Sequence, residues 1–202
     1  MTTDGDNLAE LLSSIRACRI CEADLPLGPR PVLVADPRAP VLIAGQAPGT
    51  KVHESGIPWD DASGDRLRDW LGVDKDTFYD PQNFAIIPQG FCYPGRLPKG
   101  GDAPPRPECT ETWHPRLVPM LPNIQMILAV GQYAHKYYLG TRRQKTLTET
   151  VAHYHDYGPD ILPLPHPSWR VTGWLKRNDW FETEILPHLR ARIRALLKET
   201  ST

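Results

Sequence analysis

The spacing of apolar residues along the chain predicts alternating strands and helices. Short apolar runs, typical of strands buried on both faces, occur at Val32–Ala35, Val41–Ala44, Phe84–Ile87, Met126–Val130 and Asp160–Leu164. The segments between them predict helices at Leu8–Arg16, Gly64–Leu71, Gln132–Leu139 and Asp179–Leu197. Alternation of this kind predicts an α/β fold, a three-layer arrangement with a mostly parallel sheet between two helical layers.

Single residues mark where some of these helices begin, end or bend. Ser63 is the expected N-cap of the helix at Gly64–Leu71, and Gly72 is its expected stop. Pro187 is expected to kink the last helix, because a proline inside a helix removes one backbone hydrogen bond.

Length and composition indicate one soluble domain, residues 1–202, with residues 1–7 expected to be flexible. The chain has 202 residues, a net charge of -1 and 40% hydrophobic residues, so it is not basic overall, and any nucleic-acid contact depends on local clusters. No apolar run approaches the roughly 18 residues needed to span a membrane. The polar, acidic start is also unlike an export signal. We therefore expect a cytoplasmic protein, and a monomer.

Loops that follow predicted strands carry the candidate chemistry. These are Gly45–Gly49, Pro88–Pro94 and Pro165–Ser168. Because ligands bind outside the carboxyl ends of strands in such sheets, we expect the three loops to converge on one site. The first loop, taken alone, is also compatible with an ordinary turn. His166 stands between two prolines, whose rings restrict its backbone, as a catalytic or binding imidazole requires.

The four cysteines form two pairs. Cys18 and Cys21 have two residues between them, within one turn, whereas Cys92 and Cys109 have sixteen residues between them. Four thiolates of this kind can hold zinc or an iron–sulfur cluster. Buried thiols and disulfides are the alternatives, although persistent disulfides are uncommon inside cells.

Together these motifs resemble the uracil-DNA glycosylase superfamily, in particular its iron–sulfur family 4. That family has a Gly-Glu-Ala-Pro-Gly motif, then a spaced glycine, a Pro-Phe pair and a further glycine. The chain has Gly45–Gly49 and His166-Pro167-Ser168, and the spaced positions are Gly56, Pro58-Trp59 and Gly64. The segment Ile127–Ala134 and the order of the cysteines are also similar, so the resemblance covers roughly residues 8–198.

The resemblance implies a central four-stranded sheet and a DNA repair activity in base excision. The reaction is hydrolysis of the N-glycosidic bond of uracil, or of another deaminated or damaged base, in single-stranded DNA or a damaged duplex. It also implies a structural 4Fe-4S cluster bound by the four cysteines, Cys18, Cys21, Cys92 and Cys109. Zinc remains the alternative, since thiolate ligands alone do not separate the two.

The resemblance further assigns roles around the base. Gly45, Ala47, Pro48 and Gly49 are expected to surround the base, and Trp59 takes the place of the phenylalanine that stacks on it. The other reading of Trp59 is a core residue. His166 is the expected catalytic donor to uracil O2, where negative charge develops as the bond breaks.

One departure from the family pattern concerns the catalytic water. Gln46 stands where the family has a glutamate, and an amide can orient water but cannot accept its proton. His53 is the candidate to assist Gln46, with Glu54, Asp60 and Asp61 as further possibilities. If position 46 still faces the water, Gln46→Glu is expected to raise uracil excision.

A second departure concerns recognition of the base edge. Pro88 replaces an asparagine of the family, and a proline side chain offers no hydrogen bond. Gln89 is the expected replacement, with Asn83 as the alternative.

The segment after His166 predicts a DNA contact. Basic residues next to aromatic ones suit phosphate binding and a wedge into the duplex; the candidates are Ser168, Trp169, Arg170, Lys176 and Arg177.

Three classes of function therefore stand at this stage. The first is a DNA glycosylase, and the second is a non-catalytic or altered relative that binds nucleic acid or a nucleobase. The third is a zinc-stabilised hydrolase that uses His53, His114 or His166.

Overall fold

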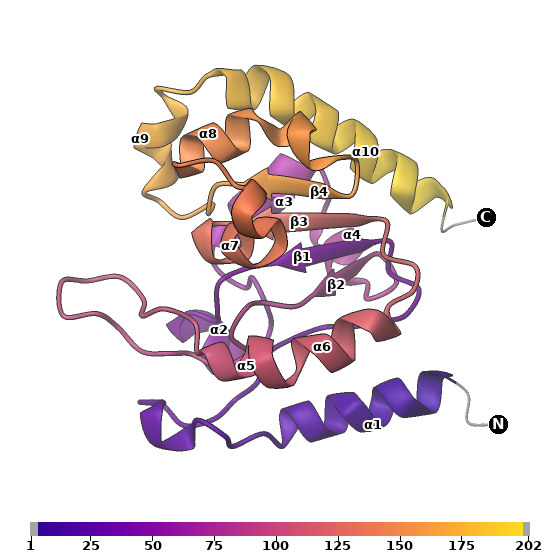
Figure 1. Cartoon of the computed structure of the whole chain (residues 1–202), viewed down its shortest axis with the longest axis vertical. Helices are drawn as coiled ribbons and strands as arrows, with labels where there is room; N and C mark the ends of the chain where they lie inside the picture. Colours follow the sequence, from indigo (N-terminus) through magenta and orange to yellow (C-terminus); the bar gives the residue numbers. More distant parts are fainter. Residues whose placement is uncertain (1–3, 200–202) are drawn as a thin grey trace.

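The computed structural model describes residues 4–199 and has a parallel four-stranded sheet at its centre (Figure 1). The strands are β1 (Val41–Ala44), β2 (Phe84–Ile86), β3 (Met126–Val130) and β4 (Ile161–Leu164). Each coincides with a predicted apolar run, and nearly all of their residues are buried. The prediction of a mostly parallel sheet is confirmed.

The order of the strands is β2-β1-β3-β4. The chain leaves β1 for β2 on one side and then returns past β1 to reach β3 on the other. All pairs are parallel, with Val41 in register with both Phe84 and Met126. The four carboxyl ends therefore meet at one edge, and the order reverses beside β1, where such folds bind ligands.

Helices cover both faces of the sheet. They are α1 (Asp4–Arg16), α2 (Thr50–Ser55), α3 (Ala62–Leu71), α4 (Lys75–Tyr79), α5 (Pro107–Thr112), α6 (His114–Leu117), α7 (Gln132–Leu139), α8 (Leu147–Ala152), α9 (Val171–Leu175) and α10 (Leu186–Glu199). Short 3-10 turns lie at Glu22–Asp24, Val118–Met120, Gly140–Arg142 and Tyr154–Tyr157.

Alternation along β1 separates the two layers. Val41 and Ile43 pack into a cluster with residues of α3 and α10, whereas Leu42 packs with residues of α1 and α6. Successive side chains of a strand point to opposite faces, so one fully apolar strand serves both layers. Figure 1 shows α10 and α8 on one side of the sheet and α1, α5 and α6 on the other.

The predicted strand Val32–Ala35 is wrong. Its residues form no regular ladder: Val34 makes one isolated antiparallel bridge with Ile86, and the Val32 amide bonds to Phe91 O. Val32 and Leu33 are nevertheless buried. The apolar run thus reports burial beside the edge strand β2 and not an added strand.

Helix ends differ from the prediction in two places. Asp61, not Ser63, caps α3, because its carboxylate accepts the Gly64 amide at 2.8 Å. Gly72 ends the helix in the left-handed conformation, as predicted. The last helix is not continuous from Asp179: a π-helical turn at Phe181–Ile185 precedes α10, and Pro187, which lacks an amide hydrogen, follows directly.

Of the segment expected to be flexible, residues 4–7 lie in the first turns of α1, and residues 1–3 lie outside the described part. Within residues 4–199, no helix has the length and apolar character required to cross a bilayer.

Candidate functional site

The carboxyl ends of all four strands open into one cleft of about 570 Å³. Gly45 follows β1, Pro88 follows β2, Gln132 follows β3 and His166 follows β4, and all four residues line the cleft. The predicted convergence of the strand-end loops is therefore found in the fold.

Most of the predicted site residues lie together in this cleft. Those that line it are Gly45, Gln46, Ala47, Pro48, Gly49, Trp59, His166, Ser168, Trp169 and Arg170. Four others do not line it, namely His53, Gln89, Lys176 and Arg177.

Trp59 and His166 lie side by side in the cleft. Their ring centroids are 5.6 Å apart with an interplanar angle of 34°. A Cβ added to Gly45 would lie 3.0 Å from the edge of the Trp59 indole, so the absence of a side chain at Gly45 admits the ring. Trp59 also packs against the core cluster of α3 and α10. The indole thus packs on the core and also lines the cleft, and its role in base stacking stays a prediction.

The backbone of Trp59 is held in a strained conformation. Its φ is 59°, and Trp59 is the single described residue other than glycine with a positive value. Arg68, buried beneath it, donates to Trp59 O at 3.3 Å. A Cβ on Gly64 would lie only 1.7 Å from Trp59 O, so α3 can approach this carbonyl only with a glycine at position 64. The surrounding structure, not local preference, fixes the ring.

Long-range hydrogen bonds hold the loop that carries His166. Arg66, on α3, donates to Pro167 O at 3.3 Å and to Ser168 O at 2.7 Å. On the other side, His135 Nε2 lies 3.0 Å from both Ala129 O and Leu164 O, which ties α7 to the ends of β3 and β4. The imidazole therefore stands on a loop fixed from two directions.

Burial lowers the pKa of His166, while Asp61 and Asp102 act in the opposite direction. A histidine with a pKa below its ordinary value is neutral near neutral pH. A neutral imidazole still donates one hydrogen bond, which suits a group that faces developing negative charge.

His53, Gln89 and Asn83 do not join the cleft. His53 lies on α2 with its ring 6.2 Å from that of Tyr93. Gln89 is 3% exposed, and its side-chain nitrogen has no partner among the described residues. Asn83 donates to Thr77 O at 3.1 Å. The catalytic role of His53 and the base contact of Gln89 stay predictions without support from this placement.

A hairpin that the sequence analysis missed forms the opposite side of the cleft. It comprises residues 95–103, between the third and fourth cysteines, and Figure 1 shows the loop there extending from the body of the molecule beside α2. The backbones of Arg96 and Asp102 pair in an isolated antiparallel β-bridge. Gln46 Nε2 donates to Ala103 O at 3.1 Å. The adjacent glycines, Gly100 and Gly101, are a turn signal that could have identified it.

The outer rim of the cleft presents an aromatic residue and a cation. Trp169 is 77% exposed, and the Arg170 guanidinium lies 5.4 Å from its ring centroid. A Cβ on Gly101 would lie 3.1 Å from Arg170, so the hairpin and this loop meet at the rim. Lys176 and Arg177 follow α9 just beyond.

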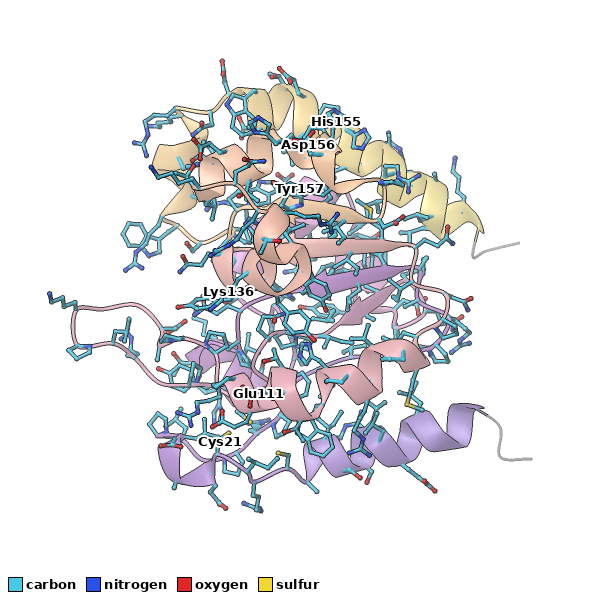
Figure 2. All side chains as sticks on the ribbon, in the orientation of Figure 1. Cys21, Glu111, Lys136, His155, Asp156 and Tyr157 are labelled. Atoms are coloured by element: carbon cyan, nitrogen blue, oxygen red, sulfur yellow. The ribbon has the colours of Figure 1, made fainter. Side chains whose placement is uncertain are left out.

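The four cysteines are free thiols in the layer of α1 and α5, and Figure 2 shows Cys21 there. Burial raises the pKa of Cys92 to about 11 and that of Cys109 to about 12. The charges of Cys18 and Cys21 add to both increases. The four sulfurs therefore lie within electrostatic reach of one another, and the disulfide alternative does not apply.

Cysteine thiols are the right type of ligand for a metal centre, but the four cysteines are not arranged to hold a single metal ion. Within residues 4–199, no three or more His, Cys, Asp or Glu side chains are placed to hold a metal ion. A single zinc needs every sulfur about 2.3 Å from the ion. The thiolate donors themselves suit zinc and an iron–sulfur cluster alike.

The sequence itself matches a family model, that of the uracil DNA glycosylase superfamily, over residues 32–190. The chain belongs to the uracil DNA glycosylase superfamily. The match includes every strand and every residue that lines the cleft, and the parallel sheet with helices on both faces agrees with it. It begins after Cys18 and Cys21, so the family 4 subgroup is not established by it.

Proposed function

We propose that this superfamily member is a DNA glycosylase that hydrolyses the N-glycosidic bond of uracil or of another deaminated or damaged base. The observation that carries the proposal is the pairing of the Trp59 and His166 rings, 5.6 Å apart, inside the cleft at the strand ends. An aromatic face and a neutral hydrogen-bond donor are the two groups that excision of a flipped base requires.

The cleft residues suggest the course of the reaction. A base turned out of the helix lies against the Trp59 indole. As the bond to C1′ breaks, its electron pair leaves with the base, and the His166 imidazole donates to the carbonyl oxygen that gains charge. One donor of this kind contributes about 3 kcal/mol to the transition state. The oxygen of a water molecule then bonds to C1′ and releases one proton, which balances the proton that the departed base takes up.

The rim provides the contact with DNA in this proposal. Trp169 is exposed enough to enter a duplex as a wedge, and Arg170 beside it suits a backbone phosphate. Arg96 and Lys99 on the hairpin add positive charge on the opposite side. The partner is thus single-stranded DNA or a duplex distorted at the lesion.

We also infer that Cys18, Cys21, Cys92 and Cys109 hold a 4Fe-4S cluster, which supplies a tetrathiolate cross-link between the end of α1 and the loops beside α5. Its role is structural, because the sulfurs lie in the α1 layer and none of the four cysteines lines the cleft. Anaerobically purified protein is expected to be brown, with broad absorption in the visible blue. A colourless protein with one zinc per chain would contradict this inference.

The experiment that tests the function is an oligonucleotide panel. Single-stranded and mismatched DNA carrying uracil, hypoxanthine, xanthine or oxidised bases is incubated with the protein and assayed for abasic sites. We expect excision of at least one deaminated base. Binding to the same DNA without excision of any base would instead support the non-catalytic relative, for which the amide at Gln46 is the supporting observation.

The zinc hydrolase gains no support from the fold. His114 is buried, with Nε2 3.0 Å from Pro88 O, and His53 lies outside the cleft that contains His166.

A further inference from the structure

We propose that Asp102, carried by the hairpin, is the carboxylate that accepts the proton of the attacking water. This inference rests on the proposed glycosylase function and adds a catalytic residue to it.

The hairpin brings Asp102 back to the cleft, where its side chain is exposed. The backbone β-bridge between Arg96 and Asp102 aligns the two arms of the hairpin. Gly100 and Gly101 turn the chain between them, with φ values of 86° and 89°. Asp102 lines the cleft beside the Gly45–Gly49 loop, where a Cβ added to Gly49 would lie 3.7 Å from Asp102 Oδ2. The carboxylate therefore faces the loop that follows β1.

Other acidic residues are less suited to this role. Among the described residues that line the cleft, Asp61 and Asp102 are the acidic ones. The Asp61 carboxylate already accepts the Gly64 amide at 2.8 Å as the cap of α3. Glu54 and Asp60, considered from the sequence, do not line the cleft. The Asp102 carboxylate forms neither a hydrogen bond nor an ion pair within residues 4–199, so it is free to bind water.

The glutamine at position 46 has a different task in this arrangement. Its amide nitrogen donates to Ala103 O at 3.1 Å, which fixes the hairpin one residue after Asp102. A glutamate cannot make this bond, because an ionised carboxylate has no proton to donate. Gln46 thus holds the hairpin by this hydrogen bond, and the hairpin supplies the carboxylate of Asp102. The sequence-based expectation for Gln46→Glu is therefore reversed: the substitution should lower excision.

The proposed step balances as a hydrolysis. Asp102 accepts one proton from water while the water oxygen forms a bond to C1′. The bond between C1′ and the base nitrogen breaks, and its electron pair leaves with the base, which takes a proton from solvent. Asp102 then returns its proton to solvent. No oxidant, reductant or metal takes part.

The test compares Asp102→Asn with three other proteins: wild type, Asp102→Glu and Glu54→Gln. Glu54→Gln also removes one carboxylate, but outside the cleft. Single-turnover excision is measured between pH 5 and 8, only at pH values where thermal unfolding shows every variant to be folded, together with DNA binding. Asp102→Asn should lose about 10²- to 10⁴-fold in rate, the usual contribution of a general base. Asp102→Glu should recover part of the loss, and Glu54→Gln should match the wild type.

The pH profile separates a base from a structural residue. Any fall in the wild-type rate at acid pH should be missing in Asp102→Asn, because an amide cannot accept a proton from water. The DNA affinity and the melting temperature of Asp102→Asn should equal those of the wild type. An unchanged rate in Asp102→Asn overturns the role of Asp102 and leaves the glycosylase in place. A lower excision rate of Asp102→Asn also overturns this role if weaker DNA binding explains it, or if the rate still falls at acid pH as in the wild type. A wild type that excises no base overturns the proposed function and this inference together.

Discussion

The two sides of the cleft are built in different ways. The framework wall, which carries Trp59 and His166, rests on α3 and on the ends of β3 and β4. The hairpin wall, residues 95–103, is joined to the cleft by the bond from Gln46 and exposes 46% of Leu97 at its turn. The two side chains proposed to meet the base are thus held by the framework, whereas Asp102, proposed to accept the proton of water, lies on a less supported segment.

This difference has a physical basis. Base stacking and donation to one oxygen depend on position within a fraction of an ångström, which only a packed framework provides. A hairpin with few buried contacts opens at a lower free energy than the core does. Changes to the framework wall should therefore alter stability, and changes to the hairpin wall should alter excision with little effect on stability.

The largest expected effect is a loss of stability at acid pH, to which the framework wall contributes through His135. Burial lowers the pKa of His114 and of His135 to about 4 in the folded protein, from an ordinary value of 6.5. The unfolded chain binds more protons between these values, so the free energy of unfolding should fall as the pH drops from 6.5 towards 4. Each histidine contributes up to roughly 3 kcal/mol.

Urea unfolding at pH 7.5 and at pH 4.5 measures this loss. His135→Gln provides the control, because an amide can donate to Ala129 O and Leu164 O but does not titrate. Its unfolding free energy should depend less on pH. A wild-type protein equally stable at both pH values would contradict the account of the framework.

Gly64→Ala should damage the framework wall by up to about 3 kcal/mol, the upper end for overpacking. The new methyl group would meet Trp59 O at 1.7 Å and must displace either α3 or the Trp59 backbone. Thermal unfolding and excision should both decline. Gly173→Ala is the matched control, since on α9 its Cβ meets only Arg177, at 3.9 Å. Equal melting temperatures for the two variants would show that the close approach is not needed.

The smallest effect on stability should come from Gln46→Ala, which frees the hairpin wall. One neutral hydrogen bond contributes about 1 kcal/mol, so thermal unfolding should shift slightly. Excision should nevertheless fall by about tenfold, because Asp102 loses its fixed position. Gln82→Ala, at an exposed site, serves as control. A Gln46→Ala variant with the wild-type excision rate would mean that the hydrogen bond from Gln46 to Ala103 does not govern catalysis.

The sequence predicted what depends on local pattern. The four strands and α7 follow directly from apolar runs, and the cleft loops follow from their position after strands. Local pattern could not separate burial from strand pairing at Val32–Ala35, and it pointed to Ser63 as the cap of α3 where the structure has Asp61.

The missed parts of the site depend on distant contacts. Arg66 reaches carbonyls about 100 residues away in the chain, and Gln46 reaches Ala103 across 57 residues. Nothing in the neighbourhood of Asp102 in the sequence suggests that it faces Gly49. Such pairings arise from the folded topology, and neither periodicity nor spacing encodes them.

The central claim is that the framework wall performs chemistry on a base and does not merely bind DNA. The most direct measurement is single-turnover excision by His166→Ala beside the wild type, with DNA affinity determined on the same oligonucleotide. We predict a rate lower by about 10²- to 10³-fold, as for loss of one donor to a developing anion, with affinity nearly unchanged. Equal rates for the two proteins would contradict the account.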